Sequence, residues 1–336
     1  MAVDAQAYSP KEFTCWIASD ATNAGTTGLH ASNMYQLDVD SVGYPSLNVM
    51  QALEVRSGIG HTLKDEDFFQ DNVLRVTELS ISGTLHNDTG HKLLLQNITN
   101  DVSGDAAVAA GHTGTSQRYG AAVTNAASSL TVVIRPSDHN KARSLEFAGM
   151  VVTNFSVSAD AGTEGGRYKF SATLQSGKKP DLNESATDSG EPTAGSNIYA
   201  NTTHALMSNA SGIKVFNTEV VLNSFTATID HPAVFTGLTS TGYEVVSRGA
   251  ECAVTADCQV KYDGETKTFV NSFDIQSEAQ SGDMFVMVNN NAFGINIQNG
   301  VLTDVSYSEG DVMMLDCSIK AVDDGTDALI SFDITS

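Results

Sequence analysis

A seven-residue pattern in which apolar residues alternate with short polar ones occurs four times in this chain. The copies are residues 76–82, 152–158, 222–228 and 302–308. Alternation with a period of two places the apolar side chains on one face of a β-strand and the polar ones on the other. Each copy therefore predicts a strand with one apolar face and one face of Ser, Thr, acid or amide side chains.

The flanks of two copies extend this similarity. Residues 145–158 align with residues 295–308 without a gap, at an offset of 150, since 295 − 145 = 150. Both copies then enter an acidic turn that contains glycine, followed by a second alternating strand at 168–174 and 313–319. The first and third copies are 146 residues apart, since 222 − 76 = 146. The spacing predicts a unit of about 150 residues that occurs twice, and the alternative is chance similarity between ordinary hairpins.

The length of 336 residues agrees with two domains. We expect domains at 1–177 and 197–336, joined by a linker at 178–196 that is rich in Gly, Pro and polar residues. The predicted fold is mainly β: two tandem, related antiparallel β-sandwich domains with long loops and at most a short helix or two.

Local signals predict the remaining elements. Acids that follow Thr62 predict a short helix in 62–72. Residues 86–90 supply turn residues before an apolar run at 92–95, and Asp263-Gly264 predicts a hairpin turn between strands at 253–262 and 266–273. Residues 101–129 have almost no large apolar side chains, which predicts a long loop or a weak surface helix, and such a loop often serves as an arm that reaches a neighbour.

Charge and composition exclude several classes of protein. Forty acids against 18 bases give a net charge of −22, with no basic stripe to bind phosphates, so ordinary DNA binding is not expected. No apolar run is long enough for a membrane span, and the first residues lack the basic and apolar parts of a secretory signal. We therefore expect synthesis in a cytoplasm. The four cysteines have no C-x-x-C spacing, which predicts small buried residues rather than zinc ligands, and a disulfide between Cys252 and Cys258 is disfavoured there.

No sequence motif predicts catalysis or a cofactor. Residues 88–90 and 188–190 resemble the Asp-Thr-Gly and Asp-Ser-Gly loops of aspartic proteases, but no apolar strand precedes either triplet and the two lie at different places in the repeats. His86 and His91 could form a metal pair with Asp88, but we expect exposed turn histidines. The acids at 65–67 and 323–324 lack EF-hand spacing. The sequence predicts a protein that is not an enzyme and that holds no metal.

With its recurring phrase at 76–82, 152–158, 222–228 and 302–308, each in a strand-turn-strand setting, this acidic, mainly β chain of two tandem units resembles the tail tube proteins of long-tailed phages. The resemblance implies a structural virion protein whose sandwich strands line a channel for DNA. In members with a duplicated domain, trimeric rings stack into a tube, and loops and terminal arms bind the neighbouring ring.

The resemblance also implies partners and a location. The partners are further copies of the chain, the tape-measure, terminator and tail-tip proteins, and double-stranded DNA that passes without specific binding, with no membrane involved. The location is the tail of the virion, assembled in the host cytoplasm. Alternation places Leu79, Ile81, Phe155, Val157, Phe225, Val305 and Tyr307 in the core. It places on the opposite face, as the expected lumen lining, Glu78, Ser80, Ser82, Asn154, Ser156, Ser158, Ser224, Thr226, Thr228, Asp304, Ser306 and Ser308.

Two other interpretations share the same strand pattern. The polar faces could be the solvent faces of an ordinary antiparallel sandwich, as in a secreted binding module. The chain could also be another virion component, such as a head decoration protein or a baseplate or tail hub protein, which would assemble only onto a partner.

Overall fold

The structure is a computed structural model. It describes residues 9–19, 34–45, 51–53, 68–70, 76–99, 105–106, 116–120, 129–136, 144–180, 198–199, 204–239, 242–249, 251–273, 280–289, 293–325 and 328–335. The chain is mainly β, its strand pairings are antiparallel, and the described part contains two short α-helices. The predicted class is therefore confirmed at this level.

The elements follow one another along the chain in two series. The first series is η1 (Pro10–Glu12), β1 (Phe13–Ser19), β2 (Tyr35–Leu37), β3 (Val39–Gly43), β4 (Gln51–Leu53), β5 (Phe68–Gln70), β6 (Thr77–Thr84), α1 (Thr89–Thr99), β7 (Asp105–Ala106), β8 (Ser116–Gly120), β9 (Leu130–Pro136), β10 (Leu145–Asp160) and β11 (Lys169–Ser176). The second series is η4 (Met207–Asn209), β12 (Ala210–Val215), β13 (Thr218–Glu219), β14 (Leu222–Asp230), β15 (Ala233–Thr239), β16 (Gly242–Arg248), β17 (Ala253–Lys261), α2 (Lys267–Phe273), β18 (Gln280–Asn289), β19 (Phe293–Ser308), β20 (Met314–Ala321) and β21 (Ser331–Thr335).

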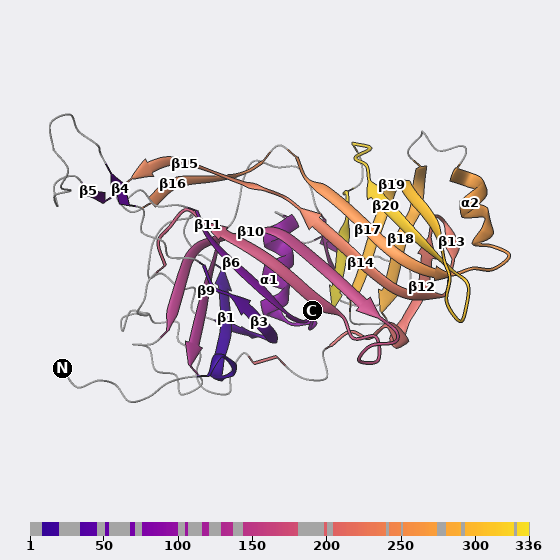
Figure 1. Cartoon of the computed structure of the whole chain (residues 1–336), viewed down its shortest axis with the longest axis horizontal. Coiled ribbons are helices and arrows are strands. Elements are labelled where there is room, and N and C mark those ends of the chain that lie inside the picture. The colour runs from indigo at the N-terminus through magenta and orange to yellow at the C-terminus, as the bar shows by residue number, and fades with distance from the viewer. Residues whose placement is uncertain are drawn as a thin grey trace.

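One wide sheet crosses the molecule, with the strand order β3-β6-β11-β10-β14-β17-β20-β19. Figure 1 shows it running from the indigo and magenta strands to the orange and yellow ones. The pairing of β10 with β14, which we call the central junction, joins strands of the two series. The four copies of the sequence pattern all lie in this sheet, in β6, β10, β14 and β19.

The long strands β10 and β19 each pair with three strands, and the partners of the first half differ from those of the second half. The first half of β10 pairs with β9, which pairs with β1, and β1 pairs with β2. The first half of β19 pairs with β18, which pairs with β12, and β12 pairs with β13. Both long strands therefore leave the wide sheet and continue into further pairings, and apolar side chains from both groups of strands form the core.

The two series repeat one arrangement. Within the wide sheet, β3-β6-β11-β10 has the same order as β14-β17-β20-β19, and the same register relates them. A register shift precedes Asn154 in β10 and Asp304 in β19. At these shifts the Oγ1 of Thr153 donates to a β11 carbonyl at 3.2 Å, and the Oγ1 of Thr303 donates to a β20 carbonyl at 3.1 Å. Residues that occupy the same place in the two series are called counterparts below.

The strand order shows that the first and third copies of the sequence pattern, which the sequence spacing had paired, do not occupy the same place in the two series. The counterpart of β14 is β3, and the counterpart of β6 is β17, so the sequence copies at 76–82 and 222–228 occupy different places despite their similar offset. The cause is that any half-buried strand acquires the same alternation, whatever its place in a sheet.

Several local predictions were wrong. Residues 89–99 form α1 and residues 267–273 form α2, where turns and strands were expected. Residues 68–70 form β5 instead of the end of a helix, and β7 and β8 lie inside the expected loop at 101–129. The rest of the predicted helix and of that loop lie outside the described residues, as does most of the predicted linker. Lys178 and Pro180, at its start, are buried.

Candidate functional site: the polar face of the wide sheet

The structure places all twelve predicted lining residues on one face of the wide sheet. Directly opposed residues in an antiparallel pair have their side chains on the same face. Across the central junction, Ser156 is opposite Thr228 and Ser158 is opposite Thr226. Continuing outward, Ser171 of β11 lies between Ser156 and Ser82, and the polar residues of β20 lie between those of β17 and β19.

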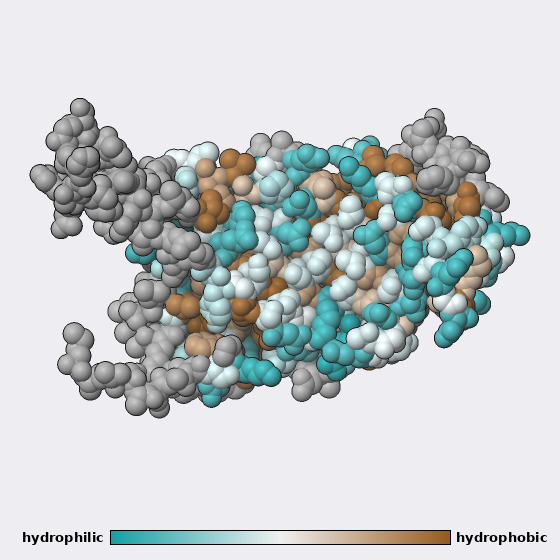
Figure 2. All heavy atoms as spheres, in the orientation of Figure 1, coloured by the Kyte–Doolittle hydropathy of each residue, from teal (hydrophilic) through white to brown (hydrophobic). Residues whose placement is uncertain are grey.

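Four more strands contribute polar side chains to this face, and the sequence analysis did not name these residues. They are Ser41 from β3, Ser171, Thr173 and Gln175 from β11, Thr255, Asp257 and Gln259 from β17, and Asp316 and Ser318 from β20. The same alternation was present in these strands and could have identified their polar positions. We call this set, together with the charged residues at the strand ends on the same side (Asp160, Lys169, Asp230, Lys261 and Lys320), the polar face. Figure 2 shows its surface over β10, β14 and β17 as mostly pale and teal.

Side chains on the polar face bind one another across neighbouring strands. The hydroxyls of Ser41 and Ser82 are 2.9 Å apart, and Gln259 Nε2 donates to Asp316 Oδ1 at 2.8 Å. The hydroxyl of Ser318 donates to Asp257 Oδ1 at 2.5 Å. These contacts use donors and acceptors within the sheet, so the face presents short side chains whose polar groups are already partly satisfied.

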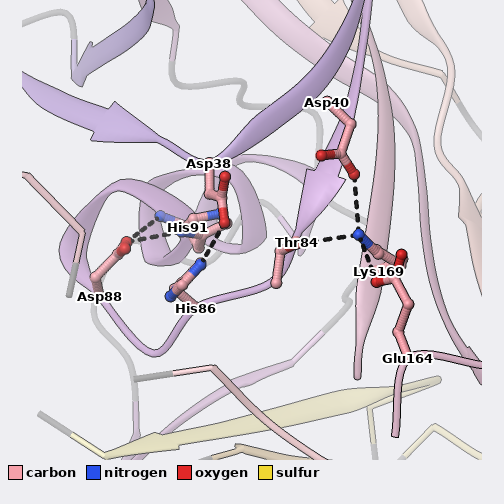
Figure 3. Close-up of polar contacts among 8 residues, drawn as sticks. All are labelled: Asp38, Asp40, Thr84, His86, Asp88, His91, Glu164 and Lys169. Carbon is pink, nitrogen blue, oxygen red and sulfur yellow. Dashed lines mark hydrogen bonds and ion pairs between the residues drawn. The ribbon is translucent and has the colours of Figure 1, made fainter. Parts of the chain in front are cut away.

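The polar face is acidic, although it is not free of lysine. Its acids are Glu78, Asp160, Asp230, Asp257, Asp304 and Asp316, and its lysines are Lys169, Lys261 and Lys320. Lys169 Nζ lies 3.0 Å from Asp40 and 3.1 Å from Glu164. Burial opposes the charged form of Lys169, but the hydrogen bonds to these carboxylates outweigh it and raise the pKa of the amine. Figure 3 shows this lysine held between its partners. It is therefore a neutralised charge on an acidic surface.

The predicted core residues Leu79, Ile81, Phe155, Val157 and Phe225 are buried on the opposite face. Val305 is half-buried, and Tyr307 is 48% exposed, so its placement in the core was wrong. Tyr307 contacts Tyr262 edge to face. Alternation places Tyr307 correctly on the apolar face, but among the described residues this part of the face is only partly covered.

His86 and His91 were expected to be exposed, and both are buried. His86 Nε2 lies 2.8 Å from Asp38 Oδ2, and His91 Nδ1 lies 2.8 Å from Asp88 Oδ1, as Figure 3 shows. The backbone N–H of His91 also donates to Asp88 Oδ1, at 2.9 Å. Asp88 is therefore the N-terminal cap of α1, and the Asp-Thr-Gly triplet begins a helix. The second triplet lies outside the described residues.

No group of three or more His, Cys, Asp or Glu placed to hold a metal ion exists among the described residues. All four cysteines are free, and all but the half-buried Cys252 are buried. Burial raises the pKa of Cys15 to about 12. The Cys15 thiol is therefore a neutral core side chain at neutral pH.

Comparison with known proteins gave no match: no protein-family model fits this chain, and no curated protein is similar to it in sequence. None of the helices described here is long and apolar enough to cross a membrane.

Proposed function

We propose that this chain is the tail tube protein of a long-tailed phage. Copies assemble into trimeric rings, and stacked rings form a tube whose lumen is the polar face. The repeated arrangement of the two series supports a duplicated unit, with related β-sandwich domains at 1–177 and 197–336 that share one continuous sheet. The chain acts as a structural part of the virion tail, without catalysis or a cofactor.

The observation that carries the proposal is that one polar, acidic face continues across both series without interruption. A solvent-exposed sheet face needs polar residues but no excess of acids, whereas the polar face carries six acids against three lysines, one of which is paired with two carboxylates. Each lysine or arginine that contacts a DNA phosphate strengthens binding through release of counterions. A channel that conducts DNA requires weak contact along its whole wall, and short hydroxyl and carboxylate side chains meet that requirement.

The same role assigns the partners. Copies of the chain bind one another around and along the tube, and the ends of the tube bind the tape-measure, terminator and tail-tip proteins. Double-stranded DNA passes through without specific binding. The tail assembles in the host cytoplasm.

Negative-stain microscopy of the purified chain over a range of concentrations tests the proposal. Rings or tubes with an open centre are expected. A chain that stays monomeric at the highest concentration, or that assembles only on another virion protein, would refute tube formation and favour a head decoration or baseplate component.

The lumen assignment has its own test. The double variant Asp257→Lys with Asp316→Lys reverses two charges on the polar face, and Glu251→Lys with Asp324→Lys reverses two exposed charges elsewhere. Tubes of the first variant should retain short duplex DNA in a salt-dependent manner, whereas wild-type tubes and the control should not. Equal retention by both variants would place the polar face outside the lumen.

A further inference from the structure

Resting on the proposed function, we propose how two copies of this chain join. The second half of β19 and the turn that follows it dock on the outer edge of β3 of the next copy. The register places Ser308 opposite Gly43 of the next copy. The central junction inside the chain is the template for this contact.

Among the described residues, nothing pairs with the outer edge at either end of the wide sheet. In the described part of the chain, β3 pairs only with β6, and residues 301–308 of β19 pair only with β20. Open edges present unpaired N–H and C=O groups that can accept another strand. A head-to-tail contact between two different edges repeats from copy to copy, and it closes into a ring when the rotation permits.

The two strands with open edges, β19 and β3, are the counterparts of two strands that pair with each other within the chain. The central junction pairs β10 with β14, with Ser158 opposite Thr226 and Val157 opposite Ala227. The counterpart of β10 is β19, and the counterpart of β14 is β3. A second copy would therefore repeat outside the chain a contact that the chain already makes inside.

The strand registers fix the residues of this contact. Ser158 is opposite Lys169 at the start of β11, and Ser308 is opposite Met314 at the start of β20, so the two serines are counterparts. On the other side, Phe225 is opposite Cys258 and Val42 is opposite Ile81. Cys258 and Ile81 are counterparts because they face Cys317 and Ala172 in the same positions of the next strand. Phe225 and Val42 are therefore counterparts, and so are the residues that follow them, Thr226 and Gly43. Because Ser158 is opposite Thr226 at the central junction, Ser308 should be opposite Gly43 of the next copy.

Two apolar side chains that are buried and opposed at the central junction have exposed counterparts at the open edges. Val157 is buried, and its counterpart Tyr307 is 48% exposed. Ala227 is buried, and its counterpart Tyr44 is 46% exposed. The proposed register places Tyr307 opposite Tyr44 of the next copy, because Val157 is opposite Ala227. Docking would cover both aromatic rings at once.

The surroundings of Tyr168 at the central junction indicate where its counterpart at the open edge should dock. It precedes β11, is fully buried, and its ring centre lies 5.5 Å from that of Phe225. Its counterpart Met313, which precedes β20, is 45% exposed. The counterpart of Phe225 is Val42, which lines a groove of about 680 Å³ beside β3 together with Phe13, Leu37 and Tyr44. This groove is open in a single copy and receives Met313 of the preceding copy.

The turn after β19 should also contact an element of the next copy. At the central junction, the turn after β10 binds η4, and the backbone N–H of Met207 donates to the carbonyl of Gly166 at 2.8 Å. η4 precedes β12 as η1 precedes β1. The turn after β19 should therefore meet η1 of the next copy. The exposed Lys11 of η1 lines the groove and offers a cation to Glu309 and Asp311 of the turn, although Asp38 and Asp40 line the same groove.

Cross-linking between copies tests the register. Ser308→Cys protein is mixed with Gly43→Cys protein, and the mixture is treated with a short bis-maleimide. Directly opposed residues have Cβ atoms about 4.5–5.5 Å apart, so a covalent dimer is expected. The control is a mixture of Asp304→Cys and Gly43→Cys proteins. Asp304 lies on the same face but four residues along β19, about 13 Å away at roughly 3.3 Å per residue, and should give little dimer. Wild-type protein measures the background from Cys252.

The outcomes separate this proposal from the tube function. Dimer formation with Ser308→Cys but not with Asp304→Cys supports the register. Tubes that form while the Ser308→Cys mixture gives no more dimer than the control would overturn the register and leave the tube function standing. A wild-type chain that never assembles would overturn both.

A second variant tests the groove without a cross-linker. Met313→Asp puts a charge on a side chain that is exposed in a single copy, so the melting temperature of the unassembled chain should not change. The concentration needed for assembly should rise at least tenfold. Val221→Asp, at a 62% exposed valine beside β14 and not on an edge strand, should assemble as the wild type does. Unchanged assembly of Met313→Asp would overturn the docking of this side chain in the groove.

Discussion

Arg248 connects three parts of the fold that lie far apart in the sequence, and its replacement should destabilise the chain strongly. It ends β16, at the base of the β15–β16 hairpin, and is buried. Nη1 donates to the carbonyls of Val152 at 2.6 Å and His231 at 3.0 Å, and Nη2 donates to the carbonyl of Asn97 and to its Oδ1. Asn97 lies in the last turn of α1. One guanidinium therefore holds the helix end, the hairpin base and the bend of β10 together.

The structure sets the size of the effect of Arg248→Met. Three backbone carbonyls lose a charged donor, while Asn97 Oδ1 keeps the N–H of Val152 at 2.7 Å. Hydrogen bonds to charged groups contribute about 1.5–3 kcal/mol each, which sums to roughly 5–9 kcal/mol. Burial opposes the charged form and lowers the pKa of Arg248 to about 10, so removal of the charge also relieves a desolvation cost. A net loss of about 3–5 kcal/mol is expected, as for other broken buried charge networks.

Urea unfolding of the unassembled chain, followed by circular dichroism, measures this loss. Arg248→Lys keeps the charge but cannot reproduce the planar fork, so it should fall between the wild type and the methionine variant. Val234→Ala, at an exposed position of the same hairpin, should change the free energy of unfolding by less than about 0.5 kcal/mol. If Arg248→Met unfolds within about 1 kcal/mol of the wild type, the relief of desolvation equals the lost hydrogen bonds and the reasoning is wrong.

Two further predictions concern the core and the histidines. Tyr168→Ala should lower the free energy of unfolding by about 3–5 kcal/mol, because the ring is buried and its hydroxyl contacts Met287. Met313→Ala, at the exposed counterpart, should change the free energy of unfolding by less than about 0.5 kcal/mol. Equal losses for the two variants in urea titrations would contradict the assignment of Met313 to an open edge. Burial lowers the pKa of His86 and of His231, so the unfolded chain binds protons more readily than the folded chain as the pH falls through about 6.5. The free energy of unfolding should therefore decrease between pH 7.5 and 5.5, and the variant with His86→Gln and His231→Gln should show a flatter dependence in unfolding titrations over this range.

The strands of the wide sheet could be predicted because each one is half-buried. Alternation in β10 and β14 follows directly from one covered and one open face, and the sequence predicted both the strands and the side on which each residue lies. The strand order could not be predicted in the same way. β6 and β14 have similar sequences because they meet similar environments, and only the register with β11 and β17 distinguishes their places.

The two helices were missed for a local reason. Asp88 and Asp263 each precede turn-forming residues, which favours a hairpin when only the sequence is considered. In the fold, Asp263 Oδ1 accepts from the backbone N–H groups of Glu265 and Thr266 at 3.0 and 3.1 Å, which fixes the turn that leads directly into α2. Asp88 satisfies an N–H group in the first turn of α1, and Asp263 satisfies N–H groups just before α2 begins. The choice between hairpin and helix depends on what the following apolar residues cover, and α1 contacts β1, β2 and β10.

Tyr307 explains why an error in predicting the core can carry functional information. The sequence pattern assigns a residue to a face, but burial depends on whether another element covers that face. Val157 and Tyr307 occupy the same place in two similar strands, and only Val157 is covered, because β14 continues the sheet beside it. An apolar residue on the core face that stays exposed therefore marks a place where a covering element is missing from the single chain. The central junction shows such a covering strand, and in the proposed contact β3 of a second copy, with its open outer edge and the groove beside it, is the counterpart of that strand.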